Sequence, residues 1–191
     1  MGTRGRLTSP SDNTVLGRAV AEVWDIERKA ALREGAFSCA KTRKELPALS
    51  EPPKFGYARA FQLPGEALKL LEICGIKGKR WTYESGKRIL TDAEAPLQVR
   101  YIKDLTEPAE FDESFAHAFA LRIAMAIGPS IAGSAFDKAG VFREYEAAIG
   151  GAQGADAIEN PPIEHEESEW IFARFQSGYD HILDGGWEDG G

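Results

Sequence analysis

The stretch FAHAFALRIAMAI, residues 115–127, decides the fold, because it is a helix-length run that is apolar nearly all round. Pro108 can sit at the start of this helix, and Gly128-Pro129 is expected to end it. A helix of this composition belongs at the centre of a protein. His117 and Arg122 interrupt the run, which is also shorter than the roughly 20 residues that a bilayer span needs. We therefore expect a buried helix and no membrane partner.

Two further helices are predicted on either side of this central run. Ser9 as N-cap and Pro10 at the first helical position predict a helix that runs to about Glu34 and stops at Gly35. Its apolar residues step by three or four and form one stripe, made of Leu16, Ala19, Val23, Ile26 and Ala30. Further along the chain, Ser130 can cap a third helix, which we expect to end at Gly150-Gly151.

Between the first two helices, four segments have the composition of strands: 67–73, 80–84, 87–92 and 97–102. Glycine, serine and proline turns separate them, and we expect a small antiparallel meander. The chain from Lys44 is irregular, because its prolines follow one another too closely for a helix or a central strand. Large apolar side chains are expected to pin this loop, namely Phe55, Tyr57 and Phe61.

These segments together predict a mainly α fold of the α+β class: a helical bundle with a small embedded antiparallel β-meander and an extended acidic C-terminal tail. The expected domain spans 1–158, with its helical core at 9–35 and 107–158 and its β excursion at 66–104. The tail comprises 159–191.

Charge is distributed unevenly along the chain. The net charge is −7, yet residues 1–104 carry nineteen basic and thirteen acidic residues, a balance of +6. Residues 159–191 carry only Arg174 against nine acids. Such tails are commonly solvated, and a smaller number dock into a basic groove. This tail also contains five aromatic residues that we predict to bind a partner, Trp170, Phe172, Phe175, Tyr179 and Trp187.

Catalytic chemistry is not indicated by any motif. The three histidines are far apart, and the sequence has no Cys-x-x-Cys, His-Glu-x-x-His or calcium-loop pattern. We therefore predict no enzyme activity, no cofactor and no metal site. Cys39 with His117 could be imagined as a thiol dyad, but an isolated cysteine of this kind is more often a packing residue. The chain has only two cysteines and no apolar leader, so we expect it to be synthesised inside the cell.

A basic hairpin is the second candidate surface. Its cations are Lys77, Lys79, Arg80, Lys87 and Arg88. Clustered Lys and Arg suffice to contact phosphates or an acidic partner, although a solvated turn is equally compatible with the pattern. The surplus of acid elsewhere argues against a protein whose main task is to grip DNA.

Several blocks, read in order, resemble the tail tubular protein A family, the head-to-tail adaptors of short-tailed bacteriophages. The most specific are AFSCAK through Leu46 (36–46) and PKFGYARAFQLP (53–64). Further blocks are 68–73, RILTD (88–92), LQVRYI (97–102), DLTEPAEFD (104–112) and YEAA (145–148). The resemblance covers residues 7–156. The chain departs from the family in lacking or shortening an initial apolar helix, and in having Phe37 where tryptophan is common.

This resemblance implies a virion structural protein that catalyses nothing. It implies a dodecameric ring at the head-tail junction, beneath the portal protein and above the tail nozzle, which continues the DNA channel. The protein would be made in the bacterial host cytoplasm, and its helices would pack against neighbouring copies. The five tail aromatics would then bind either the portal or a neighbouring subunit. Genomic double-stranded DNA would pass through the lumen without specific binding, since a lining of net acid lets a polyanion slide.

Two other classes of function remain open. A small regulatory nucleic-acid-binding protein would use the basic hairpin, and a thiol-dependent hydrolase would need Cys39.

Overall fold

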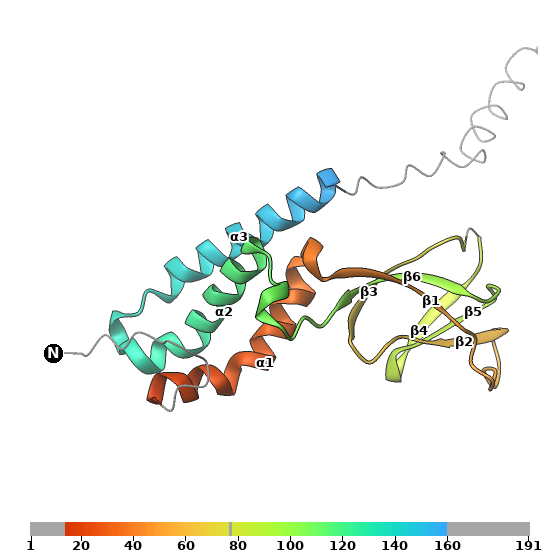
Figure 1. The fold of residues 1–191 in the computed structure, drawn as a ribbon, viewed down its shortest axis with the longest axis horizontal. Coiled ribbons are helices and arrows are strands. Elements are labelled where there is room, and N and C mark those ends of the chain that lie inside the picture. Colours follow the sequence, from red (N-terminus) through yellow and green to blue (C-terminus); the bar gives the residue numbers. More distant parts are fainter. Residues whose placement is uncertain (1–13, 77, 160–191) are drawn as a thin grey trace, which may run out of the picture. The chain divides into compact units, whose positions relative to one another are not determined.

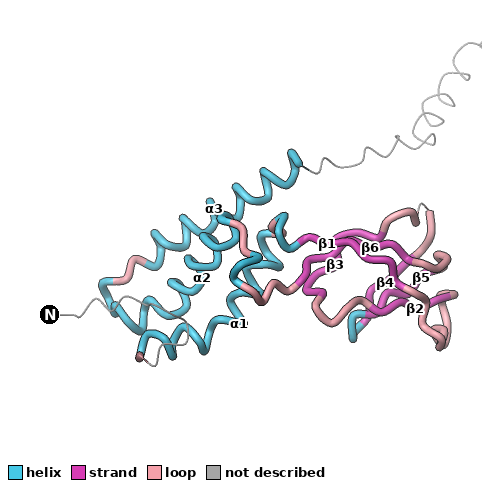
Figure 2. The backbone as a smooth tube through the Cα atoms, in the orientation of Figure 1, coloured by secondary structure: helices cyan, strands magenta, loops and turns pink. Residues whose placement is uncertain are grey.

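The computed structural model describes residues 14–76 and 78–159, and these form a mixed α+β fold (Figure 1). The chain divides into two units, Met1–Asp156 and Ala157–Gly191, and the first contains the features described below. Within the described ranges there are three α-helices and two three-stranded antiparallel sheets (Figure 2). The predicted α+β class is confirmed at this level.

The elements follow one another as helix, six strands and two helices. Their bounds are α1 Val15–Gly35, β1 Lys41–Leu46, β2 Arg59–Gln62, β3 Ala67–Ile73, β4 Trp81–Glu84, β5 Arg88–Thr91, β6 Leu97–Lys103, α2 Glu113–Ala132 and α3 Lys138–Glu159. Short 3-10 turns connect some of them, at Ser38–Ala40, Ser85–Lys87, Pro108–Glu110 and Gly133–Ala135.

Helix α1 begins later than predicted and buries a different face. Thr14 is the N-cap, and its hydroxyl accepts a hydrogen bond of 3.0 Å from the backbone N–H of Gly17. The predicted cap Ser9 lies outside the described residues. The helix ends at Gly35 as expected, because the next residue, Ala36, has a left-handed backbone with φ of 47°. Position 35 has to be glycine, because the ring of Phe37 occupies the space that a Cβ would need there.

The predicted apolar stripe of α1 is not the packed one. Val20, Ala31 and Leu32 are buried, whereas Ile26 is 69 % exposed. Trp24 lies on the buried side, where its ring meets Phe119 edge to face at 4.8 Å. Residues two apart lie about 160° apart around a helix, so Ile26 points away from the side on which Trp24 packs. The helix has two apolar faces, and spacing alone could not choose between them.

Helix α2 continues past its predicted end. It begins at Glu113, where the Asp112 carboxylate accepts from the N–H of Phe115 at 2.7 Å, and Pro108 belongs to the preceding 3-10 turn. Gly128 and Pro129 lie inside it, because a proline in the last turn removes one hydrogen bond without preventing the turn from closing.

Helix α3 also passes its predicted end. Ser130 does not cap it; its hydroxyl donates to the Ile127 carbonyl at 2.7 Å. The helix begins at Lys138 and runs through Gly150 and Gly151. Each glycine costs about 1 kcal/mol relative to alanine, and the burial of Tyr145 and Ile149 on the same helix offsets this cost.

The strands do not form the predicted meander. One sheet has the order β1-β6-β3 and the other β2-β5-β4, so β3 pairs with β6 rather than with β4. Strands β1 and β2 occupy a region predicted as irregular. Only Leu46 of β1 is buried. Its charged sequence, KTRKEL, does not alternate between apolar and polar residues, which is the pattern that marks a half-buried strand. Phe61 anchors β2 in the core as expected, whereas Phe55 is 86 % exposed.

Two apolar cores share strand β6. Ile102 belongs to the core of the helical part, with the helix residues Leu32 and Phe115. Leu97 and Val99 belong to a second core. Its other fully buried members come from the remaining strands and loops, including Phe61 and Ile89. Because both cores draw on β6, a change in this strand acts on both.

A buried ion pair joins α1 to the segment after β6. The Arg28 side chain is 4 % exposed, and its Nε and Nη2 donate to Asp104 Oδ1 at 3.2 and 3.1 Å. Arg28 also donates to Asp25. The backbone N–H of Asp104 donates to the Glu66 carbonyl at 2.8 Å, which ties the same residue to the start of β3. Arg28 is not part of the apolar stripe predicted from the sequence, and its carboxylate partner explains why it is buried.

Replacing Asp104 by alanine should destabilise the protein by about 3 kcal/mol, because it removes the buried carboxylate and leaves the Arg28 guanidinium with only the exposed Asp25 as its acidic partner. The measurement is the free energy of unfolding in urea. Lys29→Ala is the matched control, since Lys29 contacts the same carboxylate at 3.8 Å from an exposed position and should contribute less than about 1 kcal/mol. Equal losses from the two substitutions would contradict the role given to Arg28.

Candidate protein-interaction surfaces

Helix α2 leaves much of its apolar surface uncovered. The segment Glu113–Ala135 is long and apolar enough to cross a membrane by length and composition, and 28 % of its apolar window is buried. The same test is met by core helices, and here Phe115, Ala118 and Phe119 pack into a core. The expectation of a helix buried on all sides is therefore wrong, and one side of α2 lacks a neighbour within the described chain.

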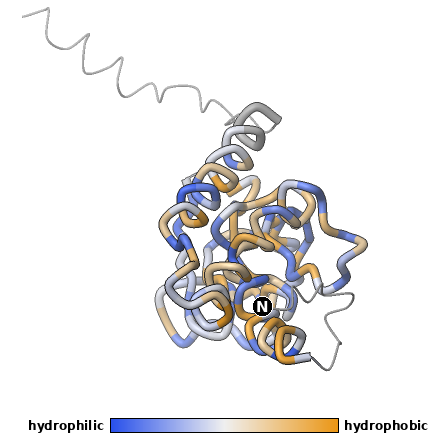
Figure 3. Tube along the Cα trace, turned by 90° about the vertical axis from the view of Figure 1, so that its left-hand side faces the viewer, coloured by the Kyte–Doolittle hydropathy of each residue, from blue (hydrophilic) through white to orange (hydrophobic). Residues whose placement is uncertain are grey.

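Other exposed apolar side chains lie on all three helices. Val15 is 76 % and Ile26 69 % exposed on α1, and Ile131 and Phe142 are exposed on α2 and α3. Val15 and Ile26 are eleven residues apart, close to three helical turns, and so share one face. We call Val15 together with the predicted stripe the outer α1 stripe; Val15 and Ile26 are its exposed members, and Leu16, Ala19, Val23 and Ala30 are partly buried. In Figure 3, hydrophobic segments occur at the periphery of the helical part as well as at its centre. Exposed apolar side chains on several helices are a common feature of proteins that bind another protein.

Arg122, the charged residue within the central run, serves to join the helices. Its Nε donates to Glu27 at 2.6 Å and its Nη1 to Glu34 at 2.7 Å, which ties α2 to α1. Tyr145 of α3 donates its hydroxyl proton to Glu34 at 2.8 Å. Burial, strengthened by Glu34, raises the pKa of Tyr145 to about 12, although Arg122 acts in the opposite direction. Arg122 thus has its partners within its own chain.

The predicted basic hairpin is formed by β4 and β5, but its cations do not make one patch. Arg80 precedes β4 and Arg88 opens β5 opposite Glu84. The two arginines therefore stand at opposite ends of the hairpin, about 13 Å apart along it. The structure brings Lys79 beside Arg80 and Lys87 beside Arg88, and Lys77 lies outside the described residues.

Some of these cations already have partners. Arg80 is bonded to Asp92 at 3.2 Å and lies over the ring of Tyr57 at 5.5 Å. Lys87 has a left-handed backbone, with φ of 62°, and its Nζ donates to the Gly65 carbonyl at 2.6 Å. Within the described ranges, the side chains of Lys79 and Arg88 form no hydrogen bond or ion pair, and both are exposed. The basic surface is thus smaller than the sequence suggested.

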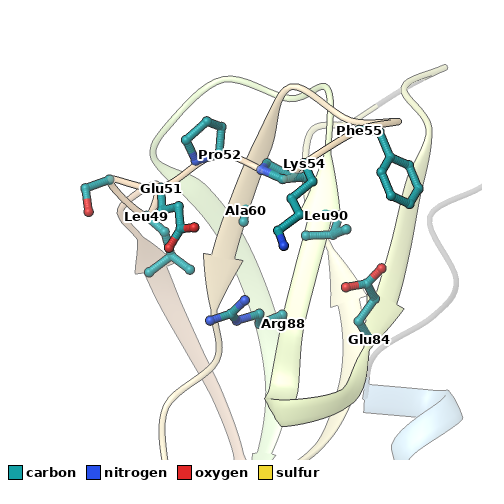
Figure 4. A pocket seen from close by; sticks show the side chains of 11 residues that line it. Leu49, Glu51, Pro52, Lys54, Phe55, Ala60, Glu84, Arg88 and Leu90 are labelled. Atoms are coloured by element: carbon teal, nitrogen blue, oxygen red, sulfur yellow. The ribbon is translucent and has the colours of Figure 1, made fainter.

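A cavity of about 440 Å³ lies between the loop of residues 49–55 and one face of the sheet β2-β5-β4. Ala60 and Leu90, which are cross-strand partners, form part of its apolar lining. Figure 4 shows four charged side chains around it, Glu51, Lys54, Glu84 and Arg88. None of these four side chains has a hydrogen bond or ion pair to another residue that the structure describes. Sequence analysis missed this site; the pattern PPKF at 52–55 was its nearest signal.

The proposed thiol dyad is not assembled. Burial raises the pKa of Cys39 to about 11, and the carboxylate of Asp112 contributes in the same direction. His117 faces Glu144, with 3.7 Å between its Nε2 and the carboxylate Oε1. No group of three His, Cys, Asp or Glu side chains suited to a metal ion occurs among the described residues.

The predicted tail residues Trp170, Phe172, Phe175, Tyr179 and Trp187 lie outside the described residues. Comparisons with protein-family models and with curated proteins find no match to this chain.

Tyr145→Phe should flatten the loss of stability at alkaline pH. The pKa of Tyr145 is about 12 in the folded protein and about 10 when unfolded. The stabilisation that Tyr145 gives the folded state is therefore complete below pH 10. It is lost between roughly pH 10 and 12, because the Tyr145 hydroxyl of the unfolded chain releases its proton at a lower pH than that of the folded protein. Urea unfolding measured across this range tests the slope. Burial also raises the pKa of Tyr101 to about 12, so Tyr101 keeps its own contribution to the pH dependence of stability in this variant. The double variant Tyr101→Phe/Tyr145→Phe should therefore lose still less stability as the pH rises. Parallel curves for wild type and Tyr145→Phe would contradict the assignment.

Cys39 should react slowly with thiol reagents. A pKa of about 11 lowers its thiolate fraction at pH 8 roughly a hundredfold relative to an ordinary thiol. The measurement is the rate of iodoacetamide modification of Cys39 in a Cys74→Ser background, compared with the same protein in denaturant. Rapid reaction of the folded protein would reopen the hydrolase hypothesis.

Proposed function

We propose that this chain is a structural protein of a phage virion, a head-to-tail adaptor that forms a ring between the portal and the tail nozzle and continues the DNA ejection channel. The observation that carries the proposal is the uncovered apolar surface of the helices, above all α2. Exposed apolar surface of this kind is typical of a subunit that packs against other copies in an assembly. The finer architecture, a helical bundle with an embedded β unit and an acidic tail, belongs to the same proposal.

The blocks that resemble the adaptor family support the proposal through their positions in the fold. The block 36–46 contains Phe37, which is buried against Phe115 at 5.3 Å between ring centroids. The block 88–92 contains β5, and 97–102 lies within β6, the strand that both cores share. The resemblance therefore falls on residues that build the fold. The departure at Phe37, where tryptophan is common in the family, falls at a fully packed position.

A ring requires each subunit to present two different surfaces, one to each neighbour. The outer α1 stripe and the uncovered side of α2 supply two such surfaces. Arg122 has its carboxylate partners within its own chain, so a neighbouring copy does not have to supply an acidic residue for it. A dodecamer, as in the family, is the proposed ring.

The charge of the helical part fits a channel for DNA. Residues 105–158 carry three basic and eight acidic residues, and Asp137, Glu144 and Glu146 are exposed. A lining of net acid repels the phosphate backbone and lets the genome pass without specific binding. The proposed partners are accordingly the portal protein, the tail nozzle and further copies of the chain, at the head-tail junction of the virion.

The alternative, a nucleic-acid-binding regulatory protein, has a weaker basis. Its hairpin cations stand at two ends of β4 and β5, and Arg80 and Lys87 are engaged with their own chain.

Ile26→Glu should abolish ring formation on the purified portal, because it places a charge in the apolar interface between neighbours. Ile26 is 69 % exposed, so the variant should fold with a stability within about 0.5 kcal/mol of wild type. Electron microscopy of portal mixed with the full-length variant is the measurement.

Tyr83→Glu is the matched control, since it adds the same charge at an exposed large side chain on β4 and should leave rings intact. Rings of Ile26→Glu at the wild-type yield would exclude the outer α1 stripe as an interface. Failure of the wild-type chain to form a ring on the portal would overturn the adaptor assignment itself.

A further inference from the structure

The cavity over the β2-β5-β4 sheet has the character of a peptide site. Its volume of about 440 Å³ lies within the roughly 300–1,000 Å³ of ordinary ligand pockets. Leu49, Ala60 and Leu90 make an apolar lining, and Lys54 and Arg88 bring two cations without partners to its rim. Apolar lining with a few charged groups at the edge suits an aromatic side chain that has acids beside it.

The chain itself contains a segment of this chemistry. Residues 160–191 pair aromatic with acidic residues directly, as in Glu169-Trp170 and Tyr179-Asp180. Phe172, Phe175 and Tyr179 follow one another at intervals of three and four residues, so the aromatic side chains are closely clustered in the sequence.

Charge complementarity selects this segment as the occupant. Residues 41–103, which contain both sheets, carry thirteen basic and seven acidic residues, a net +6, whereas 159–191 carry −8. The rim is mixed, because Glu51 and Glu84 accompany Lys54 and Arg88. A phosphate backbone would meet two repelling carboxylates there. The C-terminal segment instead offers acids for the cations and Arg174, between Phe172 and Phe175, for the carboxylates.

We propose that the cavity of one subunit binds the acidic aromatic segment 160–191 of a second copy, with an aromatic side chain in the cavity and adjacent carboxylates on Lys54 and Arg88. The proposal rests on the proposed function for the presence of neighbouring copies. The segment has thirty-two residues and spans up to about 110 Å when extended, enough to cross a subunit boundary. Each subunit would then tie itself to a neighbour by a strap separate from the helical interface.

Cross-linking between isotopically distinct full-length chains tests this. Equal amounts of ¹⁴N and ¹⁵N protein are mixed and treated with a carbodiimide, which joins carboxylates to amines without a spacer. Mass spectrometry should find links between Lys54 of one isotope and a carboxylate of 160–191 of the other. Absence of mixed links at Lys54, or links only within one isotope, would overturn the proposal.

Variants locate the contact within the cavity. Arg88→Gln should reduce the yield of mixed Lys54 links roughly fivefold, because it removes a cation from the rim. Lys79→Gln, an equal change of charge at an exposed residue outside the cavity, should leave the yield within about twofold. Replacing all five aromatics by alanine, Trp170, Phe172, Phe175, Tyr179 and Trp187, should remove the links while leaving all charges in place. Equal yields from Arg88→Gln and Lys79→Gln, or links that survive loss of the aromatics, would mean non-specific attraction and contradict the proposal.

The cross-linking is carried out on the free protein and on rings assembled on the portal, so its failure is distinguishable from that of the adaptor assignment. Rings that form on the portal without mixed links would contradict the proposed strap and leave the adaptor assignment intact. Mixed links from a chain that never joins the portal would support the proposed strap and contradict the adaptor assignment.

Discussion

A guanidinium cannot be buried without a carboxylate, and this requirement fixes how the two halves of the fold meet. Arg28 faces inward from α1, and Asp104, which it contacts, stands where the chain leaves β6. The same residue is bonded through its backbone to Glu66, before β3. One buried charge thus sets the approach of the first helix to the sheet, and the apolar residues around Phe37 and Phe115 pack within the frame that it defines.

The sequence correctly predicted the features that depend on interactions between residues close together in the chain. The bounds of β3 were predicted correctly, and Gly35 ended α1 as expected, because turns and caps act over a few residues. Strand β1 was missed because its side chains are mostly solvated and its stability comes from pairing with β6. The buried side of α1 was predicted wrongly for a related reason. Both sides are apolar, and the choice depends on Trp24 and Arg28 finding partners that lie far away in the sequence.

The candidate surfaces were less predictable than the fold. Five cations within twelve residues looked like one patch, and the pairing of β4 with β5 separated them. The cavity was invisible in the sequence because its lining joins a loop at 49–55 to three strands that follow it, β2, β4 and β5. The exposed side of α2 could be read only once its neighbours were placed, since composition does not say whether an apolar helix is covered by its own chain or by another.

Strand β6 gives both apolar cores a common member. Its alternate residues Leu97, Val99 and Tyr101 serve one core, while Ile102 serves the other. Loss of either core removes the support from a strand on which the remaining core depends. The helical and sheet regions are therefore coupled thermodynamically and should melt in a single cooperative transition, although an inspection of the fold would suggest two independent modules. A partner that binds only one of the regions would, through this strand, protect the other from local opening.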